Sequence, residues 1–281
     1  MTTEIQPAPG ATRKRRVRSA TSLTRSSGIG LGLAVTWFSL LVLIPLALVV
    51  IQSADGGWQT FRDTLTNSQT AAALRLTVTQ ALIVTLVNVV FGTLIAWVLV
   101  RDHFWGKRIL EVIIDIPFAL PTIVAGLVLL SLYGPDSPIG INVANTERSV
   151  FLALLFVTLP FVVRTVEPVL LELDPEVEEA AASLGASRFT TLRRILLPAL
   201  APAITAGAAL SFARGISEYG SLVLLSGNLP NKTEVASVRI LTYIENGNEA
   251  AAASVAVLLL GVALIAIILL QVLTSVVSKR A

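Results

Sequence analysis

The sequence predicts an all-α, polytopic membrane protein with six transmembrane helices and both termini in the cytoplasm. Composition, the spacing of apolar runs and the placement of Lys and Arg support this fold class. Of the 281 residues, 54% are hydrophobic and 14% are charged, and the mean hydropathy is +0.79. Soluble domains carry about 25% charged residues. A soluble globule of this length would therefore have too few charges to cover its surface.

Six apolar runs are long enough to cross a bilayer, which takes about 20 residues. The third run contains Glu111 and Asp115 near its start. The last run is long enough to tilt in the membrane. The predicted spans are Leu31–Ile51, Leu76–Val100, Ile109–Tyr133, Val150–Leu171, Ala199–Leu225 and Ala250–Ser278.

The positive charges predict the orientation. With the N-terminus in the cytoplasm, fourteen of the 21 Lys and Arg residues fall on the inner side and five on the outer side, while Arg164 and Arg214 lie within spans. Inner loops of membrane proteins carry this excess. The segment of residues 1–28, which is rich in Lys and Arg, is predicted to form a disordered cytoplasmic tail. The apolar run after the tail is longer than the 7 to 15 residues of a signal-peptide core, so we expect an uncleaved span.

Composition also limits the chemistry. The chain has no cysteine and a single histidine, His103, which excludes thiol catalysis, disulfides and a histidine-based metal site. The stretch GNLPNKT, from Gly227 to Thr233, lacks the second glycine of a phosphate-binding loop. We therefore expect no catalytic residue, no metal and no cofactor bound by this chain. A basic tail on a nearly neutral body indicates orientation in a lipid bilayer and not a nucleic-acid partner.

The segment Asp174–Pro198, DPEVEEAAASLGASRFTTLRRILLP, is predicted to be a helix-turn-helix on the cytoplasmic side. Asp174 is a good N-cap, with proline at the first helical position. Gly185 stands where a helix ends in a left-handed residue. Ser187 can cap a second short helix, which Pro198 is expected to end before the fifth span.

Apolar residues recur at Val177, Ala181 and Leu184, which predicts one apolar face on the first short helix. Such a face suits an amphipathic connector lying on lipid. It also suits a ridge of small residues that inserts into a groove on a partner protein. Composition alone leaves both interpretations open.

The spacing in this segment resembles the signature loop of ABC importer permeases, the binding-protein-dependent inner-membrane subunits. The resemblance implies the ABC importer permease fold, with a core at residues 72–277 and a coupling loop at 174–198. Residues 29–71 would add a first transmembrane helix and an outer loop. The residues implied to dock into the ATP-binding subunit are Glu179, Ala180, Ala181, Gly185, Ile195 and Pro198.

Four other stretches are similar to the sulfate/thiosulfate permeases, most closely to the T-type subunit: Gly106–Gly126, Leu159–Leu173, Arg214–Ser221 and Asn231–Ile240. The resemblance implies a bacterial inner-membrane subunit that passes sulfate or thiosulfate inward by alternating access. The implied partners are two ATP-binding subunits that hold ATP and Mg, a second related permease and an external sulfate-binding protein. Molybdate permeases share much of this pattern, so molybdate or another oxyanion stays open as the cargo.

Two other classes fit the sequence less well. A gradient-driven secondary transporter usually has more spans and often an internal repeat, and no repeat is obvious here. A membrane-embedded enzyme needs acids, histidines or metal ligands gathered at one membrane face. The one acidic cluster, Glu176–Glu179, lies at a predicted helix start without a histidine.

Charged residues inside spans are costly and usually face the interior of the helix bundle or water. Arg164 and Glu167 are three residues apart, and Arg214 and Glu218 are four apart, so each pair shares a helix face. Either arginine can attract the oxyanion, or both pairs are structural and cancel their own fields.

Prolines interrupt two of the predicted spans. We expect Pro117 and Pro121 to break the third span, and Pro160 and Pro168 to break the fourth. Such breaks line cavities in transporters, where helix N-termini can meet an anion. Ordinary kinking is the other interpretation.

Overall fold

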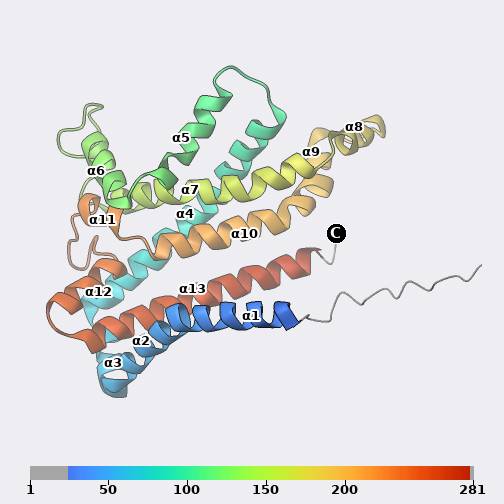
Figure 1. Ribbon diagram of the computed structural model, residues 1–281. Coiled ribbons are helices and arrows are strands. Elements are labelled where there is room, and N and C mark those ends of the chain that lie inside the picture. Colours follow the sequence, from blue (N-terminus) through green and yellow to red (C-terminus); the bar gives the residue numbers. More distant parts are fainter. Residues whose placement is uncertain (1–24, 279–281) are drawn as a thin grey trace, which may run out of the picture. The chain divides into compact units, whose positions relative to one another are not determined.

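The computed structural model describes residues 25–278, with side chains described from residue 27 to residue 272. All of the elements in this range are helical (Figure 1). The chain divides into two units, Met1–Leu48 and Val49–Ala281. The predicted tail lies outside the described residues except for its last four, which form the start of helix α1 (Arg25–Phe38).

The first predicted span is a single apolar helix. Helix α1 continues through a π-helical turn, η1 (Ser39–Leu43), into α2 (Ile44–Asp55). Pro45 has no N–H to donate to the preceding turn, and the wider π turn accommodates the missing hydrogen bond. The resulting apolar helix, Ser27–Asp55, is long enough to cross a membrane.

Three long helices form the centre of the second unit: α4 (Ser68–Arg101), α7 (Glu147–Glu172) and α10 (Leu197–Ile216), with α13 (Glu249–Ser278) packed against α10. Small residues let them approach closely. A Cβ on Gly92 would lie 2.8 Å from Cβ of Val162, and a Cβ on Gly207 would lie 3.0 Å from Cα of Val162. Close approach over small residues is how helices associate in membranes, where the hydrophobic effect adds little.

A buried polar cluster joins the same three helices. Nδ2 of Asn88 on α4 donates hydrogen bonds to Oγ1 of Thr158 on α7, at 2.8 Å, and to Oγ of Ser211 on α10, at 3.2 Å. All three residues are buried. Each interhelical hydrogen bond of this kind stabilises membrane helices by about 0.6–2 kcal/mol, so Asn88 fixes the register of the three helices.

The third predicted span consists of two helices instead of one straight helix. Helix α5 (Lys107–Ala119) and helix α6 (Thr122–Tyr133) meet at an angle of 119°. The break falls at Pro121, as predicted, whereas Pro117 lies inside α5 without ending it. Within the described range, five helices are long and apolar enough to cross a membrane, or six if the bent pair is one span.

The fourth predicted span does not break at its prolines, and that prediction was wrong. Helix α7 runs uninterrupted through Pro160 and Pro168, because neighbouring helices pack along both of its sides and support the weakened turns. The fifth predicted span, Ala199–Leu225, does break, since α10 ends at Ile216 and the short helix α11 (Gly220–Leu225) follows. Helices α3 (Gly57–Thr66) and α12 (Ala236–Glu245) are too short to span.

Candidate functional site

The connector between α7 and α10 has the predicted local geometry. Helix α8 (Pro175–Ser183) is capped by the Asp174 side chain, which accepts a hydrogen bond from the N–H of Glu176 at 3.0 Å. Gly185 adopts a left-handed φ of +82°. Ser187 Oγ accepts from the N–H of Thr190 at 3.2 Å and caps helix α9 (Arg188–Thr191). Local side-chain chemistry therefore fixes both short helices.

The end of the connector differs from the prediction. Pro198 does not end the second short helix, because α9 continues through a π-helical turn, η2 (Leu192–Leu196), into α10. Pro198 has no backbone N–H, so one helical hydrogen bond is missing, and the wider π-helical turn before it accommodates this loss. Helix α9, the turn η2 and α10 thus form one continuous helix, Arg188–Ile216.

The predicted coupling residues fall into three groups by exposure. Glu179, Ala180 and Gly185 are exposed, Ala181 is buried, and Ile195 and Pro198 are half-buried. The prediction of a single apolar face on α8 was therefore wrong, because Ala181 is buried while Val177 and Leu184 are exposed.

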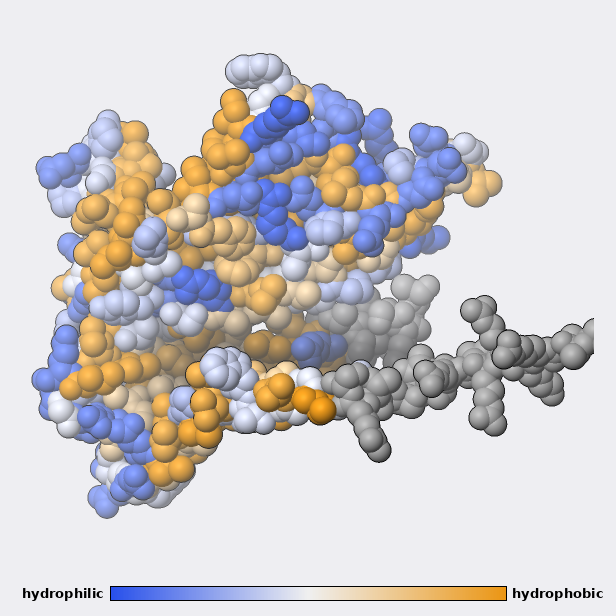
Figure 2. All heavy atoms as spheres, viewed as in Figure 1, coloured by the Kyte–Doolittle hydropathy of each residue, from blue (hydrophilic) through white to orange (hydrophobic). Residues whose placement is uncertain are grey.

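The most exposed apolar side chains of the connector flank its turn. Leu184, before Gly185, is 89% exposed, and Phe189 on α9 is 69% exposed. Figure 2 shows hydrophobic and hydrophilic residues side by side over α8 and α9. A turn that projects two large apolar side chains is a suitable shape for insertion into a cleft.

Arg101, at the last residue of α4, fastens the connector to the helical core. Its guanidinium forms an ion pair of 3.0 Å with Glu178 on α8 and donates to the carbonyl oxygen of Leu173 at 3.0 Å. Sequence reasoning did not assign this role to Arg101. The available signal was its position at a helix end on the same predicted side as the connector.

Both predicted ion pairs within spans are present. Arg164 contacts Glu167 at 2.6 Å, and Arg214 contacts Glu218 at 2.6 Å. Arg164 also forms a bidentate pair with Asp115 on α5, through Nε at 2.8 Å and Nη2 at 2.5 Å. This second carboxylate was missed, although a carboxylate inside a predicted span usually pairs with a cation.

Glu218 occupies the break between α10 and α11. Its side chain is fully buried, and Oε1 accepts hydrogen bonds of 2.9 Å from both the N–H and the Oγ–H of Ser221. A carboxylate in this position caps the first turn of α11. Oε2 of Glu218 forms the ion pair with Arg214, so Glu218 links the end of α10 to the start of α11 across the break.

The third and fifth predicted spans are both broken, and their second halves, α6 and α11, lie against each other. Helices α6 and α11 pack against each other. A Cβ on Gly126 would lie 2.7 Å from the carbonyl oxygen of Ser221, and one on Gly220 would lie 2.8 Å from the backbone nitrogen of Ile123. Glycine is therefore required at both contacts. That the break in the third span lines the path of an anion stays a prediction.

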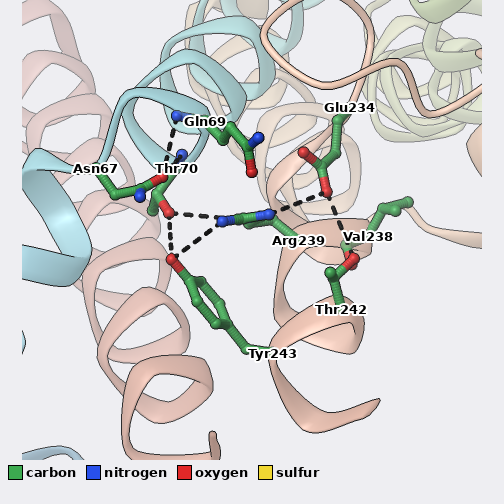
Figure 3. A network of polar contacts seen from close by, with 8 residues as sticks. All are labelled: Asn67, Gln69, Thr70, Glu234, Val238, Arg239, Thr242 and Tyr243. Atoms are coloured by element: carbon green, nitrogen blue, oxygen red, sulfur yellow. Dashed lines mark hydrogen bonds and ion pairs between the residues drawn. The ribbon is translucent and has the colours of Figure 1, made fainter. Parts of the chain in front are cut away.

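A second polar network lies at the other end of α4, about 50 Å from Arg101 along the helix. Figure 3 shows Arg239 of α12 between Glu234, Thr70 and Tyr243. Arg239 lies 3.9 Å from the Glu234 carboxylate, and its guanidinium carbon is 4.5 Å from the centre of the Tyr243 ring. Tyr243 Oη is in turn hydrogen-bonded to Thr70 at 2.7 Å. The network joins α12 to the start of α4.

Comparison with known proteins places this geometry in a family. Residues 88–280 match the family described as the binding-protein-dependent transport system inner membrane component. The chain is 39% identical over 259 residues to the sulfate transport system permease protein CysT of Salmonella typhimurium, covering 90% of this chain and 94% of that protein. It is 41% identical over 259 residues to the protein of the same name from Synechocystis, covering 90% and 91%.

Solved structures share the fold. A crystal structure of a bacterial alginate ABC transporter in complex with a pentasaccharide-bound periplasmic protein matches with a TM-score of 0.73 at 16% identity, covering 90% of this chain and 94% of that one. The MetNI methionine ABC transporter matches with a TM-score of 0.52 at 20% identity, covering 74% and 95%. The chain belongs to the family of binding-protein-dependent transport system inner membrane components.

Proposed function

We propose that this chain is the membrane-spanning permease subunit of an ATP-driven importer for sulfate and thiosulfate. The relatives that span nearly its whole length are named sulfate transport permeases, which supports sulfate as cargo. An external binding protein delivers the anion, and the chain pairs with a second, related permease and with two ATP-binding subunits. Both termini and the connector lie in the cytoplasm, in agreement with the distribution of Lys and Arg.

The observation that carries this proposal is the connector. Leu184 and Phe189 project from its turn, and they enter the cleft of one ATP-binding subunit together with Glu179, Ala180 and Gly185. Ala181, Ile195 and Pro198 face the protein and hold the turn in place. Because α9 and α10 are one helix, closure of the ATPase subunits on ATP moves α10 and switches the access of the pathway.

The ion pairs within the spans are structural in this proposal. Arg164 faces two carboxylates, and Arg214 faces one that is fully buried. Little positive field is left at either site to attract an anion. Replacing Arg214 by Gln should lower membrane abundance and transport in proportion. Loss of transport at normal abundance would instead assign Arg214 to the anion path.

Uptake of radiolabelled sulfate tests the cargo, in cells with and without this gene and with unlabelled thiosulfate or molybdate as competitors. We expect deletion to abolish uptake, thiosulfate to compete and molybdate to compete poorly. If sulfate uptake survives deletion, the cargo is another oxyanion. Uptake that persists when ATP is depleted, but collapses with the ion gradient, would indicate a secondary transporter.

A further inference from the structure

Charged side chains are partly exposed on one side of the pair formed by α5 and α7. The side-chain exposure is 48% for Asp115, 30% for Arg164 and 19% for Glu167. Glu111, one turn before Asp115, accepts a hydrogen bond of 3.3 Å from Arg164 Nη2 through its carbonyl oxygen, while its carboxylate forms no ion pair with a described residue. Figure 1 shows α5 at the edge of the second unit, and Figure 2 shows hydrophilic residues gathered where it meets α7. This side therefore carries three carboxylates and one guanidinium.

These charges lie at the depth of the hydrocarbon layer. Helix α7 is about 39 Å long, so a layer of about 30 Å centred on it leaves roughly 5 Å of helix beyond each edge. Arg164 lies about 12 Å before the end of α7 at Glu172, which places its backbone roughly 7 Å inside the layer. Asp115 lies about 12 Å after the start of α5 at Lys107 and contacts Arg164 directly.

The exposed side of this cluster is suited to water and not to lipid. Charged residues inside spans almost always face the interior of the bundle or a water-filled cavity. A long arginine can reach back to the membrane surface, but the short side chain of Asp115 cannot. A protein surface covering the cluster would have to supply further cations, because three carboxylates against one guanidinium leave two formal negative charges. Water hydrates the exposed oxygen atoms without any partner charge.

We propose that this side of α5 and α7 lines the water-filled inner part of the transport path, through which the anion leaves. Its placement on the inner side rests on the proposed function, from which it takes the orientation of the chain. Arg164 is held by Asp115 and Glu167 and offers no free cation to the anion. The remaining negative charge repels a departing oxyanion, so this surface releases the anion instead of retaining it.

Cysteine labelling tests the proposal, because the chain contains no cysteine of its own. Val112 and Ile113 are neighbours on α5, with exposures of 65% and 53%. Val112 is three residues before Asp115 and shares its side of the helix, whereas Ile113 points away from that side. The assembled transporter in inside-out vesicles is treated with a membrane-impermeant methanethiosulfonate reagent. The reagent attacks the thiolate, which forms readily only in water, so Val112→Cys should react at least about tenfold faster than Ile113→Cys.

A second position and a charge variant sharpen the test. Ala119 is exposed and four residues after Asp115, so Ala119→Cys should react as Val112→Cys does, if either variant assembles poorly the other still reports. Glu111→Gln leaves the ion pairs of Arg164 intact. At Val112→Cys it should lower the rate with a cationic reagent relative to that with an anionic reagent by at least about threefold.

The outcomes separate this proposal from the proposed function. Equally slow reaction at Val112→Cys, Ala119→Cys and Ile113→Cys would overturn the water-filled path along α5. An unchanged ratio of the two reagents in Glu111→Gln would refute the repulsion of the anion. Fast reaction in right-side-out vesicles alone would overturn the inner placement and the orientation on which it rests. The labelling itself does not depend on which anion the importer carries.

Discussion

Arg101 and Glu178 join the end of α4 to the connector through an ion pair of 3.0 Å, and both side chains are largely shielded, at 17% and 26% exposure. The same guanidinium holds the carbonyl oxygen of Leu173, just after α7. One side chain therefore links the ends of two central helices to α8. The connector is therefore joined to the long helices in two ways: by this ion pair and by the continuous helix from α9 into α10.

Replacing Arg101 by Gln should weaken coupling more than it weakens folding. Loss of a charge-assisted, shielded contact costs about 1.5–3 kcal/mol, and α8 would then be held by its other end alone. We expect sulfate uptake per transporter to fall several-fold while ATP hydrolysis continues. Arg108→Gln is the control, since Arg108 is exposed and forms no ion pair with a described residue. Unchanged uptake in Arg101→Gln would refute the role of the ion pair.

Replacing Gly185 by Val should uncouple ATP hydrolysis from uptake. The residue has φ of +82°, where an L-amino acid costs about 1–2 kcal/mol and a β-branched one more. The turn between α8 and α9 must then change shape. Gly140→Val is a matched control, with φ of +73° and no atom near its Cβ, as at Gly185. Strain without uncoupling is expected there. Equal effects of the two variants on coupling would contradict the assignment.

The cluster around Arg164 should behave as a structural unit. Arg164→Gln leaves Asp115 and Glu167 without their cation, so we expect it to lower the apparent Tm of the purified complex more than Asp115→Asn does. The double variant should recover part of that loss, with a coupling of about 1–2 kcal/mol between the two sites. Additive effects in this double-mutant cycle would show that the two side chains do not stabilise each other.

Glu234, in the connection between α11 and α12, predicts a pH dependence of stability. Burial raises the pKa of this carboxyl above its ordinary value of 4.5, and Arg239 and Thr242 offset only part of the rise. The folded state then holds the proton more tightly than the unfolded state does. The stabilisation is complete below the ordinary pKa and is lost as pH rises through the raised one.

Thermal unfolding of the assembled transporter checks the prediction for Glu234. Between about pH 4.5 and neutrality, the Tm of the unchanged chain should decrease relative to that of Glu234→Gln. Gln keeps an oxygen for the Thr242 hydroxyl, which lies 3.4 Å from Oε1 of Glu234, while removing the titration. Parallel Tm curves for the two proteins would show that Glu234 does not titrate differently on folding.

Features set by neighbouring residues were predictable from the sequence. The cap at Asp174, the left-handed Gly185 and the cap at Ser187 each depend on a few adjacent residues, and all three are present. The pairs Arg164–Glu167 and Arg214–Glu218 follow from helical spacing in the same way.

Features set by packing were not predictable in this way. Helix α7 continues through Pro168 because the neighbouring helices α4 and α10 pack against it. The break after Ile216 has no proline and contains the buried Glu218. The contact between Asp115 and Arg164 joins residues 49 positions apart, and no local pattern specifies which carboxylate an arginine will find.

The pairing of α6 with α11 has a consequence for the order of biogenesis. Twelve residues of α6 extend about 18 Å and cannot cross a hydrocarbon layer of about 30 Å. The surface on which α6 packs, around Gly220, lies about a hundred residues further along the chain. Because chains are synthesised from the N-terminus and fold as they emerge from the ribosome, α6 is made before this surface exists. The bilayer must therefore hold α6 without its partner until about four fifths of the chain has been translated, and chains truncated before α11 would leave this surface of α6 uncovered.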